Sequence, residues 1–141
     1  MEAAMRQMGK MHQGLCRIPV LGEWLARGVS ATFAVFPVLG PSPMGRSESI
    51  DETLAMMRAS GEEMGFPFEF SELEGDEFIL ELPHCPYGFT SAEHQKPCDT
   101  AMDMDRVMLK LCGAKLTVEE TIPQGASRCK MRVRQIRKPK S

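Results

Sequence analysis

Two runs of alternating apolar and polar residues in the middle of the chain constrain its fold most. Their apolar members recur at every second position: Phe66, Phe68 and Phe70, then Phe78, Leu80 and Leu82. This period is typical of strands with one buried face, and the Glu-Gly-Asp sequence at 74–76 between them predicts a turn. The sequence therefore predicts a β-hairpin with one buried face.

Residues 1–39, before this hairpin, are rich in methionine and helical in pattern. Pro19 divides them into at least two pieces, and the turn residues at 40–45 predict a loop. A methionine stripe at helical spacing is typical of core packing, on the same chain or on a partner subunit. We therefore expect a helical segment over 1–46 and an α+β, cysteine-containing domain over 47–141.

The next helix has clear signals at both ends. Ser49 and Glu52 form a capping box at its start, and Gly65 is suited to its end. A further helix is predicted over about 99–111, with Gly113 as its stop.

Two more strands complete the pattern, around 116–118 and from Cys129 onward, with a turn at 123–127. The order of elements predicts an α+β fold, a helical layer packed on a twisted, mostly antiparallel four-stranded sheet. Basic residues alternate along the last strand opposite its apolar face: Arg128, Lys130, Arg132 and Arg134. We interpret them as a solvated face, because no interleaved aromatic residues or nucleic-acid motif accompany them.

The bulk composition narrows the class of protein. The chain has 141 residues, enough for one domain with its own core. Its start lacks the apolar region of a secretory signal, and the apolar stretch 29–39 is too short to span a bilayer. Five cysteines are an odd number for a disulfide framework, so free, metal-bound or catalytic thiols are expected, in a cytoplasmic protein that contacts no membrane.

Three of the five cysteines lie where predicted elements meet. Cys85 follows the hairpin, Cys98 opens the helix at 99–111, and Cys129 begins the last strand. A helix N-terminus stabilises a thiolate, so Cys98 is expected to be in its reactive form. Cys112 lies roughly 20 Å along the helix from Cys98 and is predicted to be a buried structural thiol; Cys16 has no assigned role.

Two kinds of chemistry are open to these thiols. Zinc or an iron–sulfur cluster would be held by Cys85, Cys98 and Cys129, with His94 as a fourth metal ligand. Alternatively, Cys98 or Cys85 is a catalytic nucleophile, with His84 or His94 as its base. The acidic residues that would orient that base are Asp99 and Asp103.

Residues 66–134 also resemble a known family. The motifs are Cys85-Pro86 at the end of the hairpin, Cys98-Asp99, and Thr-Ile-x-x-Gly-x-x-x-Cys over 121–129. They resemble the L-2-amino-thiazoline-4-carboxylic acid hydrolase-like family, which is related to vinyl-reductase-type ligand-binding domains and to iron–sulfur repressor sensor domains. Where relatives usually place an aromatic residue, this chain has Met131.

The resemblance implies a pocket between helices and sheet, and a homodimer. The first hypothesis for function is a domain that binds a metal, an iron–sulfur cluster or a small-molecule ligand through Cys85, Cys98 and Cys129. The second, a hydrolase of a small cyclic sulfur–nitrogen compound, would make the chain an enzyme; the sequence does not decide between them. A third is a dimeric interaction module in which the cysteines only pack.

Overall fold

The computed structural model describes residues 2–39 and 47–136 of the chain. In chain order the elements are α1 (Glu2–Cys16), α2 (Gly22–Leu39), α3 (Ile50–Met64), β1 (Glu69–Phe70), β2 (Glu77–Leu82), η1 (Ala92–His94), α4 (Gln95–Ala101), α5 (Asp103–Leu111), β3 (Ala114–Glu120), η2 (Ile122–Gln124) and β4 (Cys129–Gln135). The prediction of a loop at 40–45 falls outside the described residues.

The four strands form one sheet in the order β1-β2-β4-β3, and every neighbouring pair is antiparallel. Val133 on the central strand β4 lies opposite Phe78 of β2 and Leu116 of β3. These side chains share one buried face, as the alternation in the sequence requires. The predicted α+β class, a helical layer on a four-stranded antiparallel sheet, is confirmed.

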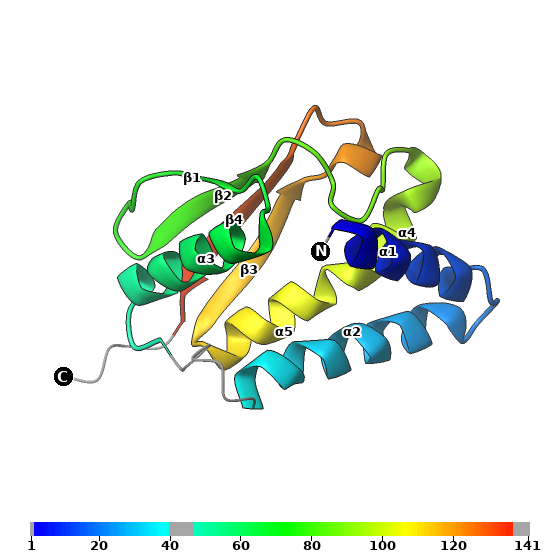
Figure 1. Cartoon of the computed structure of the whole chain (residues 1–141), viewed down its shortest axis with the longest axis horizontal. Coiled ribbons are helices and arrows are strands. Elements are labelled where there is room, and N and C mark those ends of the chain that lie inside the picture. The colour runs from blue at the N-terminus through cyan, green and yellow to red at the C-terminus, as the bar shows by residue number, and fades with distance from the viewer. Residues whose placement is uncertain (1, 40–46, 137–141) are drawn as a thin grey trace.

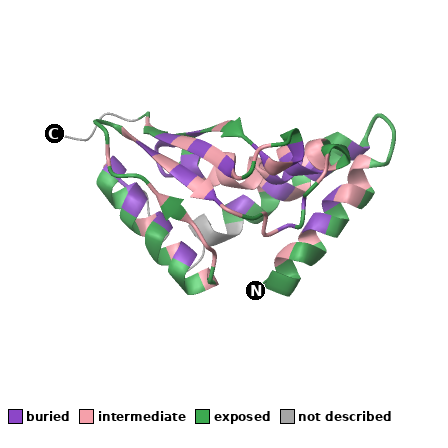
Figure 2. Ribbon diagram, turned by 90° about the horizontal axis from the view of Figure 1, so that it is seen from above, coloured by how far each residue is buried: buried purple, intermediate pink, exposed green. Residues whose placement is uncertain are grey.

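The helices gather on one face of this sheet (Figures 1 and 2). Ile50 and Leu54 of α3, together with Leu109 of α5, join the buried residues of the sheet in a single core. Farther from the sheet, α1 packs on α4, and α2 packs on both α4 and α5. The N-terminal helices therefore form an outer part of the helical layer.

The ends of α3 follow the sequence signals. The Ser49 hydroxyl accepts a hydrogen bond from the Glu52 backbone N–H at 3.2 Å, and Gly65 ends the helix in the left-handed conformation with φ of 69°. The Glu52 carboxylate accepts from the N–H of Glu48 at 2.6 Å rather than from that of Ser49. The capping box is therefore present only in its Ser49 half.

Two elements differ from the prediction. Only Glu69 and Phe70 of the expected strand over 66–70 pair with β2. The helix expected from Asp99 begins at Gln95 and breaks after Ala101, giving α4 and α5. It can begin early because Pro97 lies in its first turn, where a missing N–H costs no intrahelical hydrogen bond.

The basic face of β4 is covered by ion pairs with neighbouring strands and turns. Arg128, which directly precedes β4, binds Glu69 and Glu81, both at 2.7 Å. The three basic side chains within β4 pair with Glu119, Glu77 and Asp76. This agrees with the interpretation of these residues as a solvated face of the sheet.

Candidate functional site: an apolar cavity between the helices and the sheet

An apolar cavity of about 520 Å³ lies between the helical layer and the sheet. Its walls come from α1, α2, α3, α4, α5, the sheet and the loop after β2. Figure 2 shows α3 and α1 diverging from each other on the same side of the sheet. This volume lies within the range that is typical of ligand-binding pockets. The apolar lining favours an apolar occupant.

Methionine is the most frequent residue type in the described lining. The contributing methionines are Met5, Met8, Met57, Met64, Met102, Met104, Met108 and Met131. Unbranched, polarisable side chains of this kind adapt their shape to different occupants. The methionine stripe of α1, predicted to pack in a core, therefore forms one wall of a cavity.

The three cysteines at element junctions do converge. Cys85, Cys98 and Cys129 all line the cavity, although 44 positions separate the first from the last. A charge on either Cys85 or Cys129 would further raise the pKa of Cys98, so the three sulfur atoms lie within electrostatic range. None of the three forms a disulfide.

The prediction that Cys98 is a thiolate is wrong. Cys98 lies inside α4, and burial raises its pKa to about 12, with further contributions from Cys85, Cys129 and Asp99. Burial also raises the pKa of Cys129, although its sulfur accepts a hydrogen bond from the N–H of Ile122 at 3.5 Å. Desolvation outweighs the helix dipole, so both side chains are neutral thiols near pH 7.

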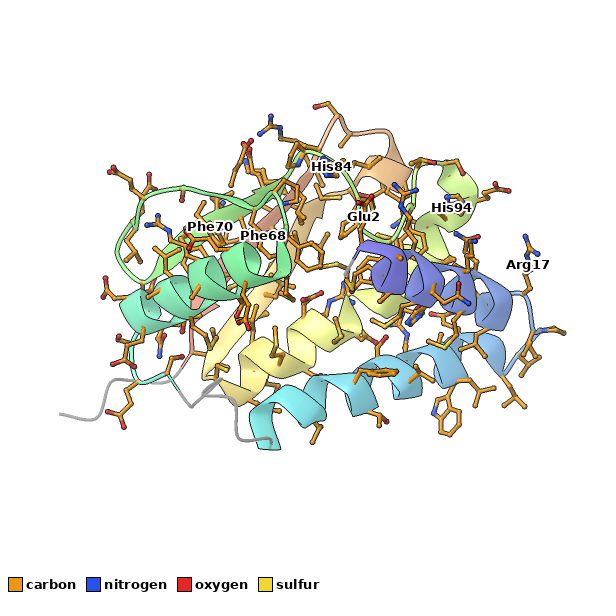
Figure 3. The ribbon with its side chains drawn as sticks, in the orientation of Figure 1. Glu2, Arg17, Phe68, Phe70, His84 and His94 are labelled. Atoms are coloured by element: carbon orange, nitrogen blue, oxygen red, sulfur yellow. The ribbon has the colours of Figure 1, made fainter. Side chains whose placement is uncertain are left out.

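The predicted metal site is not formed. In the described part of the chain, no group of three or more Cys, His, Asp or Glu side chains is placed to hold a metal ion. His94 instead caps a short helix, where its Nδ1 accepts from the N–H of Thr90 at 3.1 Å. His84 lies after β2, and neither imidazole belongs to the described cavity lining (Figure 3).

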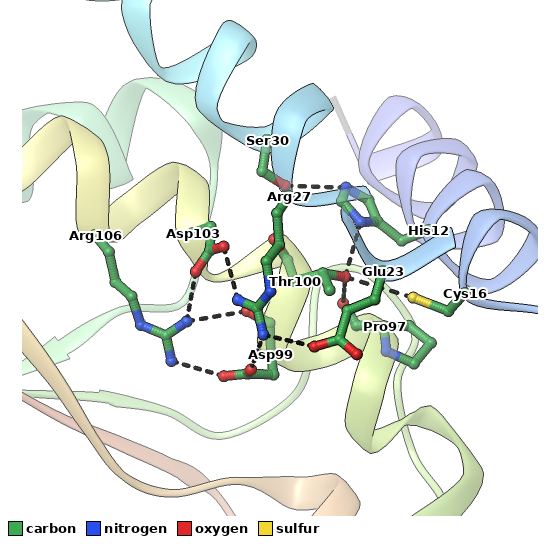
Figure 4. A network of polar contacts seen from close by, with 10 residues as sticks. All are labelled: His12, Cys16, Glu23, Arg27, Ser30, Pro97, Asp99, Thr100, Asp103 and Arg106. Carbon is green, nitrogen blue, oxygen red and sulfur yellow. Dashed lines mark hydrogen bonds and ion pairs between the residues drawn. The ribbon is translucent and has the colours of Figure 1, made fainter. Parts of the chain in front are cut away.

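The two carboxylates expected to orient a histidine are engaged elsewhere. Asp99 and Asp103 each bind both Arg27 and Arg106 at 2.7–2.8 Å, and Glu23 also binds Arg27 at 3.0 Å (Figure 4). Burial opposes ionisation of Asp99, but hydrogen bonds from the two guanidinium groups hold its pKa below the ordinary value. This polar cluster ties α2 to α4 and α5.

A second polar contact ties α1 into the same layer. Buried His12 places Nδ1 3.1 Å from the Thr100 hydroxyl and Nε2 3.3 Å from the Ser30 hydroxyl. The Cys16 sulfur lies 3.7 Å from the same Thr100 hydroxyl, which gives this previously unassigned cysteine a packing role. Cys112 is buried, as predicted.

The sequence did not point to two residues that line the cavity, Asp105 and Tyr87. Asp105 faces the cavity from α5, and burial raises its pKa to about 6. Tyr87 is buried beside it, and burial, with the charges of Asp105, Cys85 and Cys98, raises its pKa well above the ordinary value. Each looks like an ordinary helix or loop residue in the sequence, and only the fold brings them to the cavity.

The described helices include none that is both long and apolar enough to cross a membrane. Neither a family model nor a curated protein matches the sequence. Among solved structures, this chain is similar to a trafficking protein particle complex subunit 3 from Naegleria fowleri covalently bound to palmitic acid. The two share 12% identity over 99% of this chain and 85% of the other, with a TM-score of 0.50.

At that identity the similarity shows a shared fold. It corrects the resemblance drawn from the cysteine motifs, because the structural neighbour is neither a thiazoline hydrolase, a vinyl-reductase-type domain nor an iron–sulfur repressor. The hydrolase hypothesis loses its basis with that resemblance. The cysteine-site hypothesis fails as well, because no metal-holding group is found among the described residues.

Proposed function

We propose that this chain holds a fatty acyl chain in its cavity and serves as a building block of a protein assembly. The observation that carries the proposal is the cavity of about 520 Å³, which is lined mainly by methionine and other apolar side chains. Burying a methylene group is worth about 0.8 kcal/mol, so a long alkyl chain gains most from such a site. The solved neighbour, a trafficking-complex subunit covalently bound to palmitic acid, supports both parts.

Asp105 favours an uncharged form of the ligand. Its carboxyl group lies in the cavity wall with a pKa of about 6, so near pH 7 it is mostly ionised. A second carboxylate placed close to it would be repelled. We therefore propose an acyl group carried as an ester or thioester, rather than a free fatty-acid anion.

Cys85 is the thiol we propose as the attachment point. It is half-buried in the loop after β2, whereas Cys98 and Cys129 are buried thiols with raised pKa values. In the proposed step the Cys85 thiolate attacks the carbonyl carbon of an acyl thioester. A new thioester forms, the donor thiolate leaves and takes up a proton, and the Cys85 proton passes to solvent.

The test is incubation of the purified protein with palmitoyl-coenzyme A, followed by intact-mass measurement. We expect a mass gain of one palmitoyl group that hydroxylamine removes. Cys85→Ser should lose this covalent product and still bind a fluorescent acyl probe, while the matched Cys112→Ser variant should keep both. Wild-type protein that gains no acyl group and binds no acyl probe would remove the proposal.

We also propose the cytoplasm as the compartment. Its reducing conditions keep thiols unpaired, and all three cavity cysteines are found without disulfides. We also propose that the chain divides at residue 46 into a helical segment and an α+β domain, and that it forms a homodimer. The outer surface of α2 is the surface that we propose for the homodimer contact.

A further inference from the structure

Helix α2 packs inward with small residues and displays large apolar ones outward. Gly22, Ala26, Ser30 and Ala34 recur every fourth position and are buried against the helical layer. The opposite side carries Leu21, Trp24, Leu25 and Val35, with Leu21 58% and Trp24 71% exposed. A surface helix normally has the reverse arrangement, so we define Leu21, Trp24, Leu25, Gly28, Thr32 and Val35 as the α2 outer face.

Gly28 lies at the middle of the α2 outer face, one turn after Trp24 and one turn before Thr32. A Cβ atom at Gly28 would meet nothing within 4 Å, so packing within this chain does not require a glycine there. An interior helical glycine costs about 1 kcal/mol relative to alanine. A glycine at the centre of an apolar face lets another backbone approach closely, as at other small-residue helix crossings.

The polar groups on and beside this face are already satisfied within the chain. The Thr32 hydroxyl donates to the Gly28 carbonyl at 2.9 Å. Glu23 pairs with Arg27, which also binds Asp99 and Asp103. A partner can therefore cover this face without burying an unpaired charge. The face also presents no charge pattern that a partner of opposite charge would match.

We propose that a second copy of this chain covers the α2 outer face, so that two α2 helices cross at Gly28 about a twofold axis. In such an interface the same patch meets itself, which requires a surface that does not repel its own copy. An uncharged face with glycine at its centre and Trp24 beside it meets that requirement. Figure 1 shows α2 along the outer edge of the molecule, where a second helix has access.

The α2 outer face runs from Leu21 to Val35, about 21 Å at 1.5 Å per residue, and is one helix wide, which is small for a stable interface. The dimer is therefore expected to dissociate on dilution. This inference rests on the assembly part of the proposed function and names the partner. It does not depend on the cavity.

Sedimentation velocity over about 1 to 100 µM tests the proposal. Wild-type protein should pass from one-chain to two-chain mass, and Trp24→Ala should weaken the dimer by about tenfold or more. Gly28→Ala should weaken it to a similar degree while raising the unfolding temperature of the dilute protein by a few degrees, because alanine favours the helix. The matched control is Gly14→Ala on α1, also exposed with nothing within 4 Å of a Cβ, which should leave the dimer unchanged.

A wild-type chain that stays monomeric throughout this range would overturn the proposal. So would a Gly28→Ala dimer as tight as the wild type, or a monomer that floats with phosphatidylcholine–phosphatidylserine vesicles through Trp24. A monomer that still takes up a palmitoyl group would refute this inference alone. A dimer that takes up none would refute the acyl-chain function alone.

Discussion

Enlarging a side chain that faces the cavity should stabilise the protein, whereas the same change in the packed core should destabilise it. Val118 of β3 is half-buried and lines the cavity, and Val133 of β4 is fully buried in the core. Both lie on the apolar face of the same sheet, on neighbouring strands. Val118→Phe and Val133→Phe are therefore a matched pair that differs in the space available.

The expected size of the difference follows from this geometry. Phenylalanine adds roughly four side-chain carbons, worth about 3 kcal/mol if all are buried at about 0.8 kcal/mol each. Because Val118 is half-buried, we expect about half of that, a gain near 1.5 kcal/mol. At Val133 no such space exists, and overpacking should cost about 1–3 kcal/mol.

Urea unfolding at pH 7.5 measures both variants against the wild type, with the slope checked for a shared two-state mechanism. Val118→Phe should also reduce acyl-probe affinity, because the ring occupies cavity volume. If Val118→Phe lost as much stability as Val133→Phe, the cavity would not be open at that point.

Three further predictions test the helical layer and its thiols. Gly9→Ala should cost about 1–3 kcal/mol, because a Cβ there would collide with the Tyr87 carbonyl; urea unfolding measures it against Gly14→Ala, which should gain about 1 kcal/mol. Burial lowers the pKa of His12 despite the opposing charge of Asp103, so the unfolded state binds a proton more readily than the folded state. The free energy of unfolding should therefore fall as the pH drops from about 6.5 towards the folded-state pKa of His12. Urea titrations at several pH values should show a smaller pH dependence for His12→Gln. Cys98, buried with a pKa of about 12, should react with iodoacetamide at pH 8 only as fast as the protein opens, whereas half-buried Cys85 should react first. Peptide mass mapping over time measures both rates, and equal rates would contradict the prediction.

The sequence predicted the sheet because alternation reports directly on a half-buried strand. Phe78, Leu80 and Leu82 lie on the buried face, and Ser49 and Gly65 bound α3 as their side-chain chemistry requires. Each of these signals is local. A prediction that depends on residues within one turn or one strand needs no knowledge of what packs against them.

The site was harder to predict because its properties arise from contacts between distant segments. The junction positions of Cys85, Cys98 and Cys129 left their convergence open, and in the structure all three line the cavity. The predicted thiolate at Cys98 was wrong, because the prediction assumed that Cys98 lies at an exposed helix N-terminus. In the structure α4 already begins at Gln95, so Cys98 lies within the helix. Burial, which local sequence does not report, then decides the protonation state of the thiol.

The size of the cavity bears on how much stability the proposed occupant would add. At about 24 cal/mol per Å³, a sealed and empty space of about 520 Å³ would cost about 12 kcal/mol, as much as the whole stability of a typical domain; this cavity is partly open, so that figure is an upper limit. Water is a poor substitute over most of the surface, because apolar side chains outnumber the polar residues of the lining, which besides the thiols are Ser60, Glu63, Tyr87, Asp105 and Thr121. The ion pairs of Arg27 and Arg106 hold α2, α4 and α5 to one another, so any collapse that moved one of these helices relative to the others would strain them. An apolar chain fills the space without breaking those contacts, and for that reason we expect the occupied form to be the most stable state of the molecule.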